Sequence, residues 1–161
     1  MQIKSNDKLL EIGFGPGIGI QMISHSCESC TIHGIDFSKL MYKKAGKLNK
    51  TGIENNKVQL KYGDFLQIPF EESHYDKIFC LNVIYFWNEL NNPFEKIVSL
   101  LKTGGFFHIY MFDVKTLIEK KAPDSIFNKY SLEHVVDVLK LTGFSEIEHY
   151  YKKGHFIKAK K

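Results

Sequence analysis

Residues 9–19 read LLEIGFGPGIG, in which an apolar run leads into glycines at positions 13, 15 and 17. The apolar run predicts a first strand over residues 8–12, and residues 18–26 predict a helix. Glycines between a strand and a helix let the backbone turn tightly and approach a ligand. The spacing differs from the G-x-G-x-x-G fingerprint of dinucleotide-binding folds, because Ile18 occupies the third glycine position. A nicotinamide-dependent oxidoreductase is therefore the last of the alternatives that we consider.

Three acidic residues accompany the ends of the first three predicted strands: Glu11, Asp36 and Asp64. A carboxylate such as Glu11 suits a ligand that carries an ammonium group and is poorly placed beside a pyrophosphate. Asp36 can accept hydrogen bonds from both hydroxyls of a ribose, and Asp64 can accept one from the exocyclic amine of adenine. Together with the glycine loop, these residues match a ligand with amino-acid, ribose and adenine parts, which is S-adenosylmethionine.

The rest of the chain alternates strand-like and helix-like segments, as an α/β sheet with crossover helices does. Ser38 and Ser131 are placed to cap helices, Pro93 can open a helix, and Gly104 and Gly105 are expected to stop that helix. The further predicted strands are 31–36, 57–61, 75–81 and 106–111, and the further predicted helices are 38–49, 93–102 and 131–141.

The end of the chain differs in pattern from the part before it. Two strand-like runs, 144–151 and 155–159, are joined by only three residues, which predicts a hairpin and hence an antiparallel final strand. Residues 113–130 are expected to be irregular and to face the ligand, because they follow the fifth strand of a doubly wound sheet.

Four ordered blocks of the sequence resemble the class I S-adenosylmethionine-dependent methyltransferases, especially the broad small-molecule group that includes ubiquinone/menaquinone-biosynthesis-like enzymes. The resemblance runs from about Lys8 to Lys161. The blocks are LLEIGFGPGIG, GIDFSKLM, YGDFLQIPFEESHYDKIFCLNVIYFW and LLKTGGFFHIY. The resemblance implies a doubly wound, Rossmann-like α/β fold with a seven-stranded sheet of order 3-2-1-4-5-7-6, in which strand 7 is antiparallel.

The resemblance also implies which residues bind the cofactor. Gly13, Gly15 and Gly17 would line the methionine part of S-adenosylmethionine, and Glu11 would orient the loop and the amino group. Asp36 would hold the ribose, with Phe37 and Met41 near the adenine. Asp64 would meet the adenine amine, Phe65 would present its backbone to the ring, and the Asn82 backbone would lie near the methyl donor. The product of the reaction would be S-adenosylhomocysteine.

The methyl acceptor is expected to be a small molecule. The segment 82–85, NVIY, lacks both prolines of the N-P-P-Y motif with which nucleic-acid methyltransferases grip an amino group, so exocyclic base amines are disfavoured as acceptors. A general base is optional because the donor is already activated. The sequence does not choose among the candidates for a base or acceptor contact in or after strands four and five, which are Tyr85, Trp87, His108, Asp113 and Lys115.

Composition bounds the alternatives. The 161 residues fit one domain, residues 1–161, and no apolar run approaches the roughly 20 residues that a membrane helix needs. The 22 basic residues are all lysines, and the net charge of +4 does not require a nucleic-acid partner. The lysines at positions 39, 43, 47 and 50 recur at helical spacing and predict a solvated helix face.

The cysteines indicate a cytoplasmic protein with reduced thiols. Four possible zinc ligands lie within nine residues: His25, Cys27, Cys30 and His33. A structural zinc site usually separates two ligand pairs by a longer loop. We therefore expect ordinary histidines, free thiols and no metal.

Two alternatives to a small-molecule methyltransferase stay open. Family members usually carry a helical segment before the first motif, and only about eight residues precede it here, so the chain could hold S-adenosylmethionine without transferring a methyl group. The lysines motivate the other alternative, an RNA or protein methyltransferase.

Overall fold

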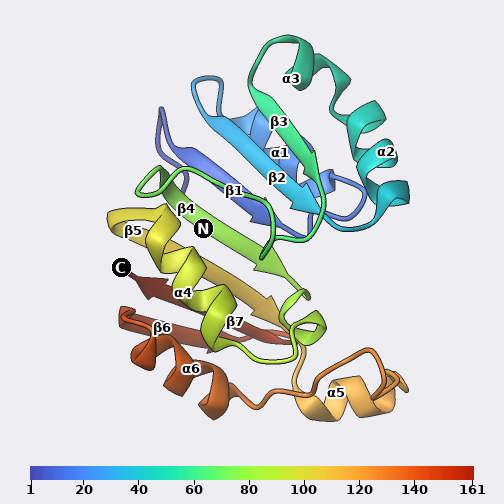
Figure 1. The fold of residues 1–161 in the computed structure, drawn as a ribbon, viewed down its shortest axis with the longest axis vertical. Coiled ribbons are helices and arrows are strands. Elements are labelled where there is room, and N and C mark those ends of the chain that lie inside the picture. Colours follow the sequence, from blue (N-terminus) through green and yellow to red (C-terminus); the bar gives the residue numbers. More distant parts are fainter.

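The computed structural model describes residues 1–161 and arranges seven strands in one sheet of order β3-β2-β1-β4-β5-β7-β6 (Figure 1). All neighbouring pairs from β3 to β5 are parallel, and β7 runs antiparallel to both β5 and β6. This confirms the strand order and the antiparallel final strand that were predicted. The strands are β1 (Lys8–Ile12), β2 (Thr31–Asp36), β3 (Val58–Tyr62), β4 (Tyr75–Leu81), β5 (Leu101–Met111), β6 (Ser145–Tyr151) and β7 (His155–Lys160).

Helices cover both faces of this sheet, because successive side chains of a buried parallel strand point to opposite faces. In β1, Leu9 packs with residues of α1 and α2, whereas Leu10 belongs to the larger core that contains residues of α4 and α6. Figure 1 shows α4 and α6 in front of the sheet. The helices are α1 (Ile18–Ser26), α2 (Lys39–Leu48), α3 (Lys50–Glu54), α4 (Asn91–Leu100), α5 (Val114–Glu119) and α6 (Leu132–Leu141), with a short 3₁₀ turn, η1, at Ile84–Phe86.

The fourth helix ends earlier than predicted. It stops at Leu100, and Leu101 already begins β5, where it pairs with Tyr75 of β4. Gly104 and Gly105 therefore lie within a strand, and the prediction that they stop the helix is wrong. The physical reason is that Leu101 is fully buried beside Tyr75, and the strand pairing shifts register before Lys77. Gly104 has a positive φ of 78° within this irregular stretch.

Residues 113–130 are more ordered than expected. Asp113 caps the short helix α5 by accepting a hydrogen bond from the Thr116 N–H at 2.6 Å. Leu117 is the only buried residue of this helix. A single buried position gives no repeating apolar pattern, so the sequence does not indicate the helix.

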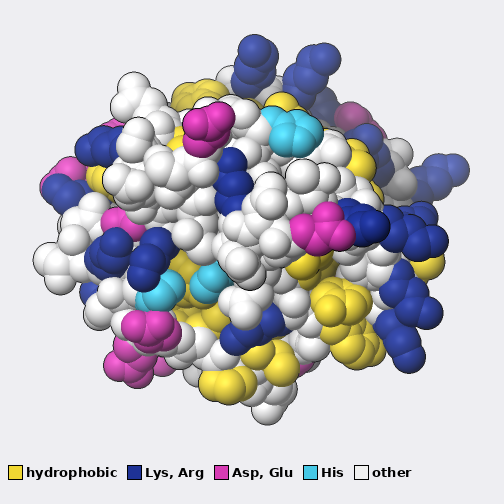
Figure 2. All heavy atoms as spheres, turned by 90° about the horizontal axis from the view of Figure 1, so that it is seen from above, with side chains coloured by type: hydrophobic (Ala, Val, Ile, Leu, Met, Phe, Trp, Pro, Cys, Tyr) yellow, Lys and Arg dark blue, Asp and Glu magenta, His cyan; other side chains and the backbone are white.

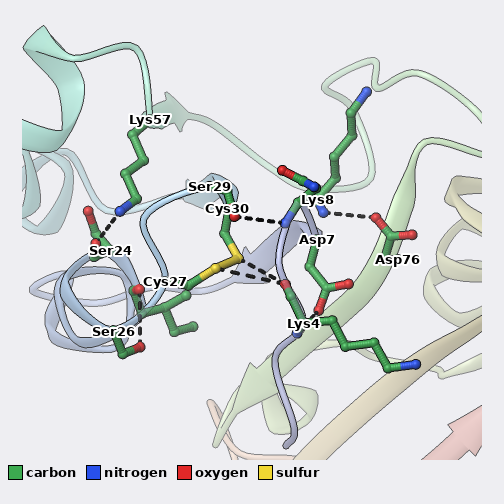
Figure 3. The surroundings of a disulfide bond; sticks show 12 residues. Lys4, Asp7, Lys8, Ser24, Ser26, Cys27, Ser29, Cys30, Lys57 and Asp76 are labelled. Carbon is green, nitrogen blue, oxygen red and sulfur yellow. Dashed lines mark hydrogen bonds between the residues drawn. A yellow bond between two sulfur atoms is a disulfide. The ribbon is translucent and has the colours of Figure 1, made fainter.

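The two cysteines before β2 form a disulfide, so the prediction of free thiols at Cys27 and Cys30 is wrong (Figure 3). Helix α1 ends at Ser26, and the following turn brings the two Cα atoms to 5.6 Å, within the range that a disulfide spans. The Cys30 sulfur lies 3.3 Å from the Lys4 carbonyl oxygen, which places the bond against the N-terminal segment. Cys80 is the one free cysteine and is buried in β4.

A buried ion pair ties the same segment to the sheet. Asp7, just before β1, accepts a hydrogen bond from the Lys77 ammonium of β4 at 2.5 Å, and both side chains are less than a tenth exposed. Asp7 also accepts one from the Lys4 N–H at 2.7 Å. The disulfide and this ion pair both lie at the amino ends of the parallel strands.

The lysines of α2 and α3 point into solvent, as predicted. All four of the residues 39, 43, 47 and 50 are exposed. Figure 2 looks onto the β3 edge of the molecule, and lysine side chains project on the side where α2 lies. None of the helices has both the length and the apolar composition that a membrane crossing requires.

Candidate functional site

A cleft of about 1000 Å³ opens at the carboxyl ends of the parallel strands. Parallel strands bring their carboxyl ends to one edge of the sheet, and ligands of such sheets bind there. Eight of the ten residues that the sequence suggested for cofactor binding line this cleft. They are Gly13, Gly15, Asp36, Phe37, Met41, Asp64, Phe65 and Asn82.

The glycine loop forms the floor of the cleft. Gly13 has a φ of 70°, and a Cβ atom there would collide with the side chain of Val83, which follows β4. Gly15 has a φ of 53° and open space where a Cβ would stand. The loop can therefore lie close both to the end of β4 and to a ligand, which a residue with a side chain at position 13 would prevent.

Asp36 connects the second strand to this loop. One carboxylate oxygen accepts a hydrogen bond from the Gly15 N–H at 2.8 Å, and the other accepts one from the Ser38 N–H at 2.8 Å. Each oxygen of a carboxylate has a further lone pair, so Asp36 can still accept two hydroxyl groups. Ser38 in turn caps α2, since its hydroxyl accepts a hydrogen bond from the Met41 N–H.

Asp64 follows β3 and is exposed at the cleft wall. Its carboxylate accepts a hydrogen bond from the Leu66 N–H at 2.9 Å, which fixes the turn that places the buried Phe65 ring beside the cleft. Lys96 of α4 braces this turn from outside the cleft, because its ammonium donates to the carbonyl oxygens of Phe65 and Ile68 at 2.6 and 2.8 Å.

Glu11 and Gly17 do not line the cleft. Glu11 shares a strand face with Leu9, so its carboxylate points toward α1 and lies 2.9 Å from where a Cβ of Gly19 would stand. It is 3% exposed, and one of its oxygens has no hydrogen-bond partner. Burial raises the pKa of Glu11 to about 8, and the negative charge of Asp36 adds to this increase. Gly17 packs α1 against Ala45 and Asn49 instead.

The outer half of the cleft comes from segments that the sequence left open. It is formed by residues after β4, including Phe86, Trp87 and Glu89, and by Ser125 and Ile126. The one feature of the sequence that could indicate these residues is that they follow the fourth and fifth strands, where the ligand-facing loops of such a sheet lie.

Asn82 marks the junction between the two halves of the cleft. It lines the cleft directly after β4 and has a φ of 58°, a left-handed conformation that asparagine tolerates better than most residues. Its N–H donates to the Tyr110 carbonyl oxygen of β5 at 2.8 Å, which fixes the backbone at this turn.

Polar contacts hold this outer loop in place. The Asn128 side-chain amide donates to the carbonyl oxygens of Tyr85 and Trp87 at 3.1 and 2.9 Å, and the Tyr130 hydroxyl donates to the Trp87 carbonyl oxygen at 2.6 Å. The Tyr85 hydroxyl accepts a hydrogen bond from the Phe112 N–H. These contacts fasten the loop after β4 to the segment after β5.

Of the five candidates for a base or acceptor contact, only Trp87 lines the cleft. The Tyr85 hydroxyl is committed to the backbone of Phe112, and burial raises its pKa above the ordinary value. Asp113 caps α5 and accepts a hydrogen bond from the Tyr151 hydroxyl, Lys115 is exposed beside Glu119, and His108 lies within β5. The cleft thus offers no histidine or lysine as a base.

The charges around the cleft have one sign. Among its 21 lining residues the charged ones are Asp36, Asp64 and Glu89, and none is a lysine or histidine. Such a site can accept hydrogen bonds from hydroxyl and amino groups and attract cations, but it offers no cationic side chain to a phosphate.

Comparison with known proteins places this geometry in context. A family model described as "Methyltransferase domain" matches residues 9–105. The uncharacterized methyltransferase YdaC of Bacillus subtilis is 29% identical over 150 residues, which cover 93% of this chain and 78% of that protein. A sterol 24-C-methyltransferase of Kluyveromyces lactis is 25% identical, with 91% of this chain and 42% of the relative covered.

Solved structures share the fold. Phosphoethanolamine N-methyltransferase 2 of Haemonchus contortus, solved in complex with S-adenosyl-L-methionine, superposes with a TM-score of 0.84 at 20% identity. The match covers 99% of this chain and 50% of that one, so the chain spans about half the length of this structure and less than half of the sterol enzyme.

Proposed function

The chain belongs to the class I S-adenosylmethionine-dependent methyltransferase family, and from this membership we propose that it transfers a methyl group from S-adenosylmethionine to a small-molecule acceptor. S-adenosylmethionine supplies a methyl group that is already activated on a sulfonium. The protein's own contribution is then to hold, align and shield the reacting groups.

The cleft fits this cofactor in its chemistry. Asp36 would accept the ribose hydroxyls through the lone pairs that its two backbone hydrogen bonds leave free. Asp64 would accept the adenine amine, with Phe37, Met41 and Phe65 packing near the ring. The glycine loop would leave room for the methionine part, and the Asn82 backbone would face the methyl donor.

Glu11 and Gly17 would act on the loop rather than on the cofactor. Glu11 lies against the start of α1, on the side of the glycine loop that faces away from the cleft, and Gly17 allows α1 to pack closely against α2. Both roles keep the glycine loop in the conformation that leaves the cleft open.

The observation that carries the proposal is the set of acceptors at the ends of adjacent strands, in a cleft without a cationic side chain. A dinucleotide would bring a pyrophosphate to the glycine loop, and RNA would bring phosphates to the rim. The phosphates of RNA favour lysine or arginine partners, so the charge of the cleft supports a small acceptor instead. The pyrophosphate of a dinucleotide is held by backbone N–H groups, and it is Ile18 at the third glycine position that disfavours a dinucleotide.

Calorimetric titration tests the proposal. We expect micromolar binding of S-adenosylmethionine and S-adenosylhomocysteine and no binding of NAD. Replacing Asp36 with Ala should weaken S-adenosylhomocysteine binding about 100-fold, because two hydrogen bonds to a charged acceptor are lost, at about 1.5 kcal/mol each.

The matched control is Glu95→Gln, which removes one exposed charge from α4 outside the cleft. It should leave the affinity unchanged. Binding of NAD but not of S-adenosylhomocysteine would reject the proposed cofactor, and equal affinity in the Asp36→Ala variant would reject the ribose assignment.

A further inference from the structure

The outer half of the cleft combines an apolar rim with a single carboxylate. Phe86 is 41% exposed at the opening, and its ring centroid lies 6.0 Å from that of Phe37, which belongs to the half assigned to the cofactor. Ile126, in the segment after β5, also lines the cleft and is 54% exposed. Large apolar side chains exposed around one opening are typical of a binding site for an apolar molecule.

Glu89 is the charged side chain of this outer half. Its carboxylate accepts hydrogen bonds from the N–H groups of Asn91 and Asn92, at 2.8 and 3.3 Å, where α4 begins. These bonds fix the carboxylate at the cleft and leave it lone pairs for a further donor. Asp36 and Asp64, the other acids, belong to the half that we assign to the cofactor.

The nearby lysines are occupied elsewhere. Lys96 is bound to the carbonyl oxygens of the turn after β3, as described above, and Lys129 forms an ion pair with Asp124. A protein with 22 lysines thus leaves the lining of this cleft without one. An acceptor that carries a carboxylate or a phosphate would find no counter-charge there, and it would be repelled by Glu89.

Aromatic side chains add to the preference for a cation. Trp87 and Phe86 lie beside Glu89 in the lining, and the faces of such rings attract ammonium groups. An amine is a cation at neutral pH when it is basic, and a fully methylated amine is always one. The same rings and carboxylate can therefore bind both the protonated acceptor, which must release a proton to Glu89 or to water before its nitrogen can attack the methyl group, and the methylated product.

From these observations we propose that the outer half of the cleft binds a basic amine carried on an apolar body, with Glu89 as the counter-charge and Phe86 and Ile126 around the apolar part. This inference rests on the proposed function, because it assigns the inner half of the same cleft to the cofactor.

The test compares three probes that share an eight-carbon chain: N,N-dimethyloctylamine, 1-octanol and octanoate. Trp87 is the only tryptophan, so its fluorescence reports on binding without requiring activity. Each probe is titrated at neutral pH, with and without saturating S-adenosylhomocysteine. We expect the amine to bind at least tenfold more tightly than octanoate, with octanol between them.

Two variants separate the contributions of charge and apolar contact. Glu89→Gln keeps an oxygen to accept the bonds that start α4, so it should reduce the amine affinity about tenfold and leave octanol binding unchanged. Phe86→Ala should weaken all three probes. Glu95→Gln removes an exposed charge from α4 outside the cleft and should change none of them.

Octanoate binding as tightly as the amine, or an amine affinity unaffected by Glu89→Gln, would overturn the inference. Failure of the proposed cofactor would be visible separately, as absent binding of S-adenosylhomocysteine. The titrations without that compound still measure the preference of the outer half.

Discussion

At the scale of single residues, the most consequential group is a carboxyl that faces away from the cleft. Glu11 is buried between β1 and the start of α1, and burial raises its pKa to about 8 from an ordinary value of 4.5. The alternation of side chains along β1 explains this position, since Glu11 shares the face of Leu9. Glu11 can therefore support the glycine loop although it does not line the cleft.

This raised pKa predicts a pH-dependent stability. Below pH 4.5 the carboxyl is protonated in both states. Between pH 4.5 and about 8 the unfolded chain releases the proton while the folded chain keeps it, so the free energy of unfolding falls as pH rises, by at most about 5 kcal/mol. Glu11→Gln should remove this part of the decline. Urea denaturation at pH 5, 7 and 9 measures it.

The control for this measurement is Glu72→Gln, at an exposed position outside the cleft. It should follow the parent protein at all three pH values. A decline of equal size in the Glu11→Gln variant would show that the buried carboxyl does not cause the pH dependence.

At the scale of elements, close contact between α1 and α2 sets the position of the glycine loop. Gly17 precedes α1 with a φ of 85°, and a Cβ there would lie 2.7 Å from the Cβ of Ala45 and from the side-chain nitrogen of Asn49. That same nitrogen donates to the Gly17 carbonyl oxygen at 3.0 Å. The two helices therefore meet where an alanine would not fit.

Two glycine substitutions should have opposite effects. Gly17→Ala adds left-handed strain of about 1–2 kcal/mol and an overpacking cost of about 1–3 kcal/mol, so it should lower the free energy of unfolding by at least 2 kcal/mol. Gly46→Ala, inside α2 with open space around it, should raise that free energy by about 0.5–1 kcal/mol. Urea denaturation distinguishes them, and equal effects would contradict the contact.

The elements also show what the sequence can predict. Ser38 and Ser131 cap α2 and α6 as expected, because an N-cap is a local interaction. The early end of α4 depends on the pairing of Leu101 with Tyr75, which lies 26 positions earlier in the chain. The residues next to Leu101 do not indicate this contact, so the sequence does not predict where α4 ends.

Some parts of the cleft can likewise be predicted from the sequence, and others cannot. The positions of Asp36 and Asp64 followed from strand ends, whereas the loop around Trp87 is held by Asn128 and Tyr130, which are remote in sequence. The disulfide between Cys27 and Cys30 is not predicted, because three cysteines are too few, and odd in number, for a disulfide framework.

At the scale of the whole molecule, the sheet separates two regions. The cleft lies at the carboxyl ends of the parallel strands, while the disulfide (Figure 3) and the Asp7–Lys77 ion pair lie at the amino ends. Ligand binding and the anchoring of the N-terminal segment therefore use opposite ends of the same strands.

This separation predicts that the disulfide affects stability without affecting the cleft. A loop closed over so few residues restricts the unfolded chain by about 2 kcal/mol, so the variant with both Cys27→Ser and Cys30→Ser should unfold at lower urea concentration by that free energy. Its affinity for S-adenosylhomocysteine should equal that of the parent protein. A tenfold loss of affinity would show that the two ends communicate.

The contact between Gly13 and Val83 has a consequence for the order of events in the cleft. These residues join the floor of the inner half to the loop of the outer half, and the space between them admits no further atom. A ligand that shifts the glycine loop must therefore shift the start of the loop after β4. Thermodynamic reciprocity then requires that each ligand alter the affinity for the other by the same factor. The two halves of the cleft would then be coupled, so that the occupancy of one half sets the affinity of the other.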